Sequence, residues 1–300
     1  MNAAVGVLGL LLVAAVIVLP VLLITSASAP VSRARVERFA RRQQLPITSG
    51  NGNQVIAYLA TTRRWRVAGL LVAIAVGITW GAYQVTRGSG EGTITLLQLL
   101  AGWFVGAVIA EARLAQRPRG QRRTAALRPR HPSAYLSRFA RAVLPAALAI
   151  SLAVTAVTAV TVLTRTAGHA VDVRLAALAA TAALVIAAVV RTVRRRVLDR
   201  PQPALPPDQL AADDAIRSRS LHVLAGAGAT LVLYAVNHQL VALRDAFPAA
   251  ETEFLGVESL ITLGAPVLGW IVATRPWSVS NHRPPAPSAA AAPTRPGGGG

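Results

Sequence analysis

Long apolar runs without charge alternate along this chain with segments rich in arginine. Several runs are 16 to 23 residues long, and roughly 20 predominantly apolar residues suffice for a helix to cross a bilayer. With 53% hydrophobic and only 14% charged residues, the composition agrees with this pattern. We therefore predict an all-α fold, a polytopic membrane helix bundle with about seven transmembrane helices. Their expected ranges are 3–25, 67–85, 94–110, 142–163, 175–190, 221–243 and 254–273.

Arginine is concentrated in the segments that we assign to one side of the membrane. Nine arginines and no acidic residue lie between Arg113 and Arg141, and further clusters follow the first and fifth apolar runs. Basic loops of this kind stay on the cytoplasmic side. We therefore expect the N-terminus outside and the C-terminus inside. Against 27 inner arginines, four fall on the outer side: Arg87, Arg165, Arg174 and Arg244.

The formal net charge of +19 follows from the same distribution. A nucleic-acid surface needs one contiguous basic face with stacking or base-reading groups. The positive-inside bias accounts for the split of the arginines without such a partner. We expect the inner arginine loops to contact anionic lipid headgroups, and we expect no nucleic-acid partner.

The two ends of the chain differ from the bundle between them. Residues 26–29 resemble a signal-peptidase site, but no positive charge precedes the first apolar run and Pro30 would follow the cut. An uncleaved first helix is therefore expected. We predict that the transmembrane bundle covers residues 1–277. Residues 278–300, rich in proline, alanine and glycine, are expected to form a disordered cytoplasmic tail.

The first inner loop contains a short amphipathic pattern. Val36, Phe39 and Ala40 share one helical face, with arginines on the other. Such a segment can lie on an anionic lipid surface. It can also be an ordinary basic flank that orients the first helix.

Small residues recur at every fourth position in two neighbouring helices. They allow helix backbones to approach closely in a membrane. Because the two helices are joined by a short turn, we predict a tightly packed hairpin. The small residues are Gly69, Ala73, Gly77 and Gly81 in one helix and Gly102, Gly106 and Ala110 in the next.

The remaining helices also show small-residue patterns. The run 175–190 is half alanine, a residue that packs well but is weakly apolar toward lipid, so we expect this helix in the interior. A further patch of alanine and glycine covers 225–229. The last six helices can be interpreted as three repeated hairpins, or their similarity can reflect the bias toward alanine and arginine.

Polar side chains gather near the outer ends of several helices. His238 lies five residues from the outer end of its helix and Glu258 four residues from that of the next, so their depths match within a turn. One hypothesis is a small outward cavity in which the two share a proton or bind a cationic or polar solute. The alternative is wetted residues at headgroup depth that join helices by hydrogen bonds. The predicted outward layer comprises Gln84, Gln98, Tyr234, Asn237, His238 and Glu258.

Other polar residues have structural interpretations. The helix 142–163 carries four hydroxyl side chains, mostly on one face: Ser151, Thr155, Thr158 and Thr161. Such hydroxyls usually donate to the carbonyl four residues earlier, although they can also line a water path.

We expect Glu111 to form a structural ion pair beside Arg113. His169, Asp172, Glu251 and Glu253 lie in outer loops but lack a firm metal-ligand spacing.

Several chemistries are missing from the sequence. Without lysine there is no Walker A loop and no Schiff-base amine, and without cysteine there are no disulfides, thiolate metal sites or cysteine nucleophiles. The motifs G-x-S-x-G and H-E-x-x-H do not occur. We therefore expect no enzyme, no cofactor and no metal site.

Residues 54–66 and 211–220 resemble stretches of uncharacterised multi-pass membrane proteins from actinobacteria. The resemblance covers most of the helical region and implies a plasma-membrane location, but it carries no functional residue. The sequence favours an accessory or scaffolding membrane subunit that docks a membrane-protein partner. The alternative is a small-solute or proton-coupled transporter that uses the outward layer. An exposed small-residue face would favour the first, and a water-accessible cavity past His238 would favour the second.

Overall fold

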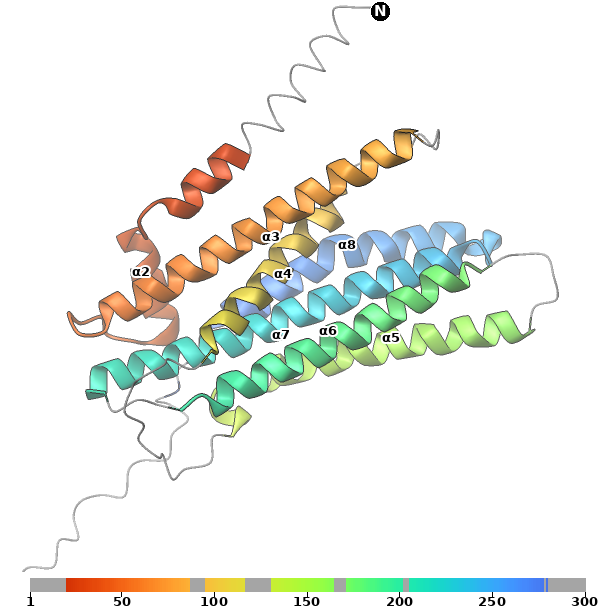
Figure 1. Ribbon diagram of the computed structural model, residues 1–300. Helices are drawn as coiled ribbons and strands as arrows, with labels where there is room; N and C mark the ends of the chain where they lie inside the picture. Colours follow the sequence, from red (N-terminus) through yellow and green to blue (C-terminus); the bar gives the residue numbers. More distant parts are fainter. Residues whose placement is uncertain are drawn as a thin grey trace, which may run out of the picture.

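The computed structural model describes residues 20–86, 95–116, 131–164, 171–201, 205–277 and 279. These residues form a bundle of helices without any strand (Figure 1). Six helices are long and apolar enough to cross a membrane, so the predicted all-α architecture is confirmed at this level. They are α3 (Gly52–Thr86), α4 (Leu96–Leu114), α5 (Arg138–Thr164), α6 (Val173–Asp199), α7 (Pro207–Arg244) and α8 (Glu251–Thr274).

Shorter elements accompany these helices, and residues 20–28 are also helical. Helix α2 (Arg33–Gln43) precedes α3, and the single turns η1 (Pro132–Ala134) and η2 (Pro248–Ala250) precede α5 and α8. Most of the first predicted helix, 3–25, and nearly all of the tail 278–300 lie outside the described residues. The count of seven helices and the outward N-terminus therefore stay predictions.

Two helices are much longer than a membrane span. Helix α3 has 35 residues and α7 has 38. At about 1.5 Å per residue both exceed the roughly 30 Å of a hydrocarbon core. The predicted helices 67–85 and 221–243 are only their apolar parts. Charged residues end a segment that can lie in lipid, but they do not end a helix. The more polar segments 52–66 and 207–220 therefore continue α3 and α7 beyond their apolar parts.

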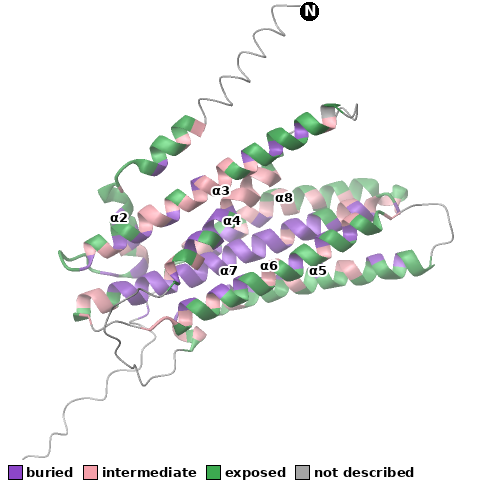
Figure 2. Cartoon of the chain, viewed as in Figure 1, coloured by how far each residue is buried: buried purple, intermediate pink, exposed green. Residues whose placement is uncertain are grey.

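Helix α7 is the centre of the bundle (Figures 1 and 2). In its apolar 18-residue window 94% of the residues are buried, compared with 17% to 33% in the other five helices. The prediction that the alanine-rich run 175–190 is interior is therefore wrong, because α6 buries only one side. Small residues at α7 itself make the central position possible.

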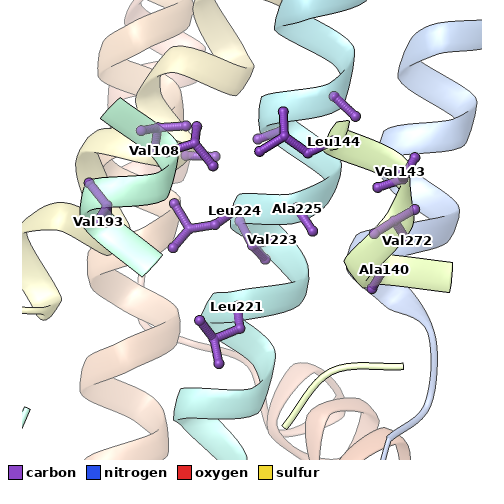
Figure 3. Packing of buried hydrophobic residues seen from close by; sticks show 14 of the residues in the cluster. Val108, Ala140, Val143, Leu144, Val193, Leu221, Val223, Leu224, Ala225 and Val272 are labelled. Carbon is purple, nitrogen blue, oxygen red and sulfur yellow. The ribbon is translucent and has the colours of Figure 1, made fainter. Parts of the chain in front are cut away.

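The alanine and glycine patch of α7 lets helices approach it on two sides. A Cβ on Gly226 would meet the carbonyl oxygen of Gly269 in α8. A Cβ on Gly228 would lie 3.0 Å from the side chain of Val190 in α6. Around the patch, residues of α7 such as Leu224 belong to one buried apolar cluster with residues of four other helices (Figure 3). They include Val108, Val143, Leu144, Val193 and Val272.

The hairpin of α3 and α4 is as closely packed as its small residues predict. A Cβ on Gly69 would collide with the backbone oxygen of Gly102, and one on Gly106 with that of Trp65. Such backbone approach gains van der Waals contact that larger side chains would prevent. The prediction of a tight hairpin is confirmed.

The apolar face of α2 packs against protein. Val36 and Phe39 are buried in a cluster with Tyr58 of α3 and Ile216 of α7. The rings of Phe39 and Tyr58 are 6.0 Å apart. The apolar residues of α2 are therefore covered by the extensions of α3 and α7, and its arginines remain at the surface of this assembly.

Candidate functional site

The predicted outward residues lie at the ends of α3, α4, α7 and α8 that are remote from the arginine clusters. Glu258 pairs with Arg244: its Oε2 is 3.6 Å from Nη1 of that arginine. Tyr234 and Asn237 are buried, whereas His238 is exposed. In the described part of the chain, no hydrogen bond or ion pair joins His238 to Glu258. The shared-proton hypothesis stays a prediction.

The two glutamines of the predicted layer differ in role. Gln98 forms a capping box at the start of α4: its Oε1 accepts from the backbone N–H of Thr95 at 3.2 Å, and Thr95 Oγ1 accepts from the N–H of Gln98 at 3.3 Å. The box satisfies two of the free N–H groups at a helix start. Gln84 is half-buried near the end of α3.

The hydroxyls of α5 form hydrogen bonds within the bundle, in agreement with the first of the two interpretations given for them. Thr155, Thr158 and Thr161 each donate to the carbonyl four residues earlier, at 2.8 to 2.9 Å. Ser151 instead accepts from Nε2 of Gln239 in α7 at 3.1 Å. Sequence reasoning overlooked Gln239, although an amide inside an apolar run is a signal for such an interhelical bond.

Of the acidic residues in the outer loops, Asp172 has a local structural role. Asp172 caps α6 by accepting from the N–H of Leu175 at 3.0 Å. His169 lies outside the described residues. Among the residues that the structure describes, no group of three or more His, Asp or Glu side chains is placed to hold a metal ion.

At the arginine end, a buried ion pair within α7 lies against the end of α6. The side chain of Arg217 is 0% exposed, and its Nη2 lies 2.9 Å from Oδ2 of Asp213. Its Nη1 donates to the carbonyls of Val197, Leu198 and Arg200 at 2.9 to 3.0 Å. The last carbonyls of a helix lack intrahelical partners and carry partial negative charge. Arg217 therefore caps α6 from the central helix.

The same region of α7 holds two further helices in place. Arg200 pairs with Asp213 and also donates to the carbonyl of Leu114 at the end of α4, at 3.1 Å. Ser218 donates to the carbonyl of Tyr135, just before α5, at 2.9 Å, and Tyr135 donates to Asp214 at 3.1 Å. These polar side chains tie helices together at the arginine end.

Glu111 does not form the expected ion pair with Arg113. It is fully buried and accepts from the hydroxyl of Tyr58 at 3.1 Å. Arg66 and Arg219 also lie near its carboxyl group. Arg113 stacks instead on the ring of Trp65, 5.2 Å from the centroid. Glu111 and Arg113 are two residues apart and therefore lie on nearly opposite faces of α4. Proximity in the sequence thus gave the wrong partner for Glu111.

The most distinctive concave site lies beside Glu111. A cavity of about 440 Å³ opens between the chain before α2, α2 itself, α3, α4, α7 and α8. No aspartate or glutamate is among its described lining residues. Its charged lining consists of Arg35, Arg38, Arg42, Arg63, Arg66 and Arg219.

The arginines of this cavity are held by specific contacts. Arg63 donates to the carbonyl of Ala27 at 3.1 Å and to that of Ala29, which closes one side of the cavity. Arg66 lies over the ring of Trp103, 5.8 Å from its centroid. The site is thus built on rigid helices rather than on loops.

A smaller apolar crevice of about 20 Å³ adjoins the cavity. The two share Arg66, Trp103, Arg219 and Trp270. The crevice runs between α4, α7 and α8. Its other residues include Phe104, Ala107, Val223, Ala227, Gly269 and Ala273.

Sequence reasoning missed the cavity because it treated every inner arginine as an orienting charge. The spacing contained a signal: Arg35, Arg38 and Arg42 recur three and four residues apart, and so share one face of a helix. Arg63 and Arg66 do the same in α3. The contribution of Arg219 depends on the depth of α7 and has no local signal.

A second notable surface is the outer side of α5. One row of its exposed residues is small, and bulky exposed residues such as Ile150, Leu152 and Val157 lie beside that row. The exposed surface of α8 has a row of bulky residues instead, with Leu260, Leu263 and Val267 between 57% and 71% exposed. The alanine stripe of α5 comprises Ala142, Ala146, Ala149, Ala153 and Ala156.

The fold and its six apolar helices fit the class of α-helical, membrane-embedded proteins. No protein-family model, no curated protein and no solved structure matches the chain.

Proposed function

We propose that this protein is an accessory or scaffolding subunit of a plasma-membrane assembly, and that α5 docks a helix of a partner membrane protein. The observation that carries the proposal is the alanine stripe of α5, which faces away from the bundle. Small residues allow a second helix to approach closely, and close packing drives helix association in lipid. The stripe meets the criterion of an exposed small-residue face.

The alanine stripe of α5 differs from the rows of bulky exposed residues on α8 and beside it on α5 itself. Bulky side chains such as Leu260 and Leu263 cover the exposed face of α8 and suit contact with lipid chains. Alanine offers lipid little apolar surface, so a row of five gains more from a neighbouring helix. The partner is therefore expected to present a small-residue face of its own.

The packing of α7 supports a role without transport. Every residue from Asp213 to Val232 except Arg219 is buried. A water-sized path along this stretch would leave some of these residues accessible. The polar groups of its first turns tie helices together, which suits a scaffold. The arginine end is proposed to rest on anionic headgroups at the inner surface.

A second candidate is a small-solute or proton-coupled carrier. It is favoured by three buried atoms that have no hydrogen-bond partner among the described residues: Tyr234 Oη, Asn237 Oδ1 and Glu258 Oε1. Unpaired buried polar atoms are costly and are often functional in membranes. Proton flux in proteoliposomes that vanishes in Glu258→Gln would favour the carrier. Flux with the unmodified protein that equals the flux of empty vesicles would exclude it.

Crosslinking in native membranes followed by affinity purification tests the accessory role. We expect one membrane protein to be recovered in near-stoichiometric amount. Ala149→Leu should reduce its recovery at least fivefold, because the larger side chain blocks close approach. Ala182→Leu, on the exposed side of α6, is the matched control and should leave recovery unchanged. Recovery of no partner, or equal recovery with both variants, would contradict the proposal.

A further inference from the structure

We propose that the arginine-lined cavity is a binding site for the phosphate group of an anionic membrane lipid, with the lipid chains along the apolar wall of the cavity. This goes beyond a general attraction of basic loops to the membrane surface, because it assigns one cavity and one chemical group. It is independent of the partner-docking role of α5.

Charge is the first argument. Six guanidinium groups line the cavity, and no carboxylate is among the described lining residues. Glu111, behind Arg66 and Arg219, supplies one negative charge at most. Guanidinium groups held this close repel one another unless an anion lies between them. Arginine also binds phosphate oxygens through two parallel N–H donors.

Unused hydrogen-bond donors are the second argument. Arg63 Nε, Arg66 Nε and Arg219 Nη1 are buried, and none has an acceptor in the described part of the chain. Burial of a donor without an acceptor is unfavourable. The three arginines come from α3 and α7 and line the same cavity. A phosphate group offers several acceptor oxygens to such a set of donors.

The apolar side of the cavity favours a lipid over a free anion. Leu23, Val67, Trp103 and Trp270 lie on its wall beside the arginines. Trp270 is also 59% exposed on the outer surface of α8, so it borders both the cavity and the surroundings of the bundle. Tryptophan prefers the boundary between headgroups and hydrocarbon. A lipid could therefore enter sideways, with its chains along Trp270 at the surface of α8.

Contacts with the neighbouring helices hold the arginine walls in place. Phe39 anchors α2 on Tyr58, which fixes the side of α2 that carries Arg35 and Arg38. Arg63 is bonded to backbone carbonyls before α2, at Ala27 and Ala29. A site formed in advance loses less freedom on binding than one assembled by the ligand.

Native mass spectrometry of the full-length protein in detergent tests the site. The probes are phosphatidic acid, phosphatidylglycerol and inorganic phosphate. We expect the two lipids to be retained at low micromolar concentration and Arg63→Gln/Arg66→Gln to weaken their binding at least tenfold. The control Arg191→Gln/Arg195→Gln removes the same charge from the exposed surface of α6 and should change binding less than twofold.

A second variant guards against misfolding. Arg35 and Arg38 are exposed, so Arg35→Gln/Arg38→Gln should leave the circular dichroism spectrum unchanged and still weaken lipid binding several-fold. Equal losses of lipid binding in the cavity variants and in the control would mean that binding depends only on the total charge of the protein. That result would overturn the proposed site. Inorganic phosphate that displaces the lipid at equal concentration would overturn the lipid assignment in favour of a free anion.

Discussion

Arg217 and Asp213 form an ion pair one helical turn apart in α7, 2.9 Å between Nη2 and Oδ2, in which the arginine side chain is fully buried. Arg217 also caps the last carbonyls of α6. Arg217 therefore joins the central helix to its neighbour at the arginine end.

Arg217→Gln should destabilise the protein by about 1–3 kcal/mol, because Oδ2 of Asp213 and the helix-end carbonyls lose their donor, although Arg200 still pairs with Oδ1 of Asp213. Thermal unfolding in detergent, followed by circular dichroism, measures the loss. The control is Arg33→Gln, which removes another pair at a four-residue spacing, with Glu37, but on the surface. Its effect should be too small to resolve. Similar melting temperatures for both variants would contradict the structural role of Arg217.

Gly226→Val should loosen the crossing of α7 and α8, because its Cβ would occupy the position of the Gly269 carbonyl oxygen. Overpacking of this kind costs about 1–3 kcal/mol. Gly256→Val is the control, since nothing lies within 4 Å of a Cβ at that position of α8. Unfolding in a denaturing detergent compares the two. A loss of stability with Gly256→Val as large as with Gly226→Val would refute close packing at the crossing.

Tyr58→Phe should destabilise the protein by about 1–3 kcal/mol, because Glu111 then loses the hydroxyl that donates to it at 3.1 Å. Tyr83→Phe, on the exposed side of α3, is the control and should have a smaller effect. The same unfolding measurement applies. Unchanged stability in Tyr58→Phe would show that Glu111 does not depend on this hydrogen bond.

The orientation predicted from the arginines can be tested with single cysteines, because the chain has none of its own. Ser133 lies at the arginine end and Thr252 at the opposite end, and both are exposed. A membrane-impermeant maleimide should label Thr252→Cys in intact cells, and Ser133→Cys only after permeabilisation. The reverse pattern would place the arginine end outside the cell.

The apolar pattern predicted the fold class and the apolar segments of the described helices. A run of about 20 apolar residues is by itself the signal for such a segment, whatever the rest of the fold. The tight hairpin of α3 and α4 followed from Gly69, Gly102 and Gly106 for the same reason. The sequence pattern did not predict which helix lies at the centre of the bundle and which lie outside. Alanine content suggested an interior α6, yet alanine serves equally on an outer face, as α5 illustrates.

The arginine cavity could not be predicted from charge alone. Each basic segment obeys the positive-inside rule, so the number of its arginines carries no signal for a binding role. Only the helical extensions of α3 and α7 bring Arg63 and Arg219 beside α2. The partner of Glu111 was missed because Tyr58 is distant in sequence and meets it only through helix packing.

Site-specific photo-crosslinking tests the central claim most directly. A photoreactive amino acid is placed at Ala149 on α5 or at Leu263, which is 61% exposed on α8. The account predicts that position 149 forms an adduct with one other membrane protein, while position 263 yields adducts with lipid only. Adducts with lipid alone at both positions, or with a second copy of this chain at position 149, would contradict the accessory role.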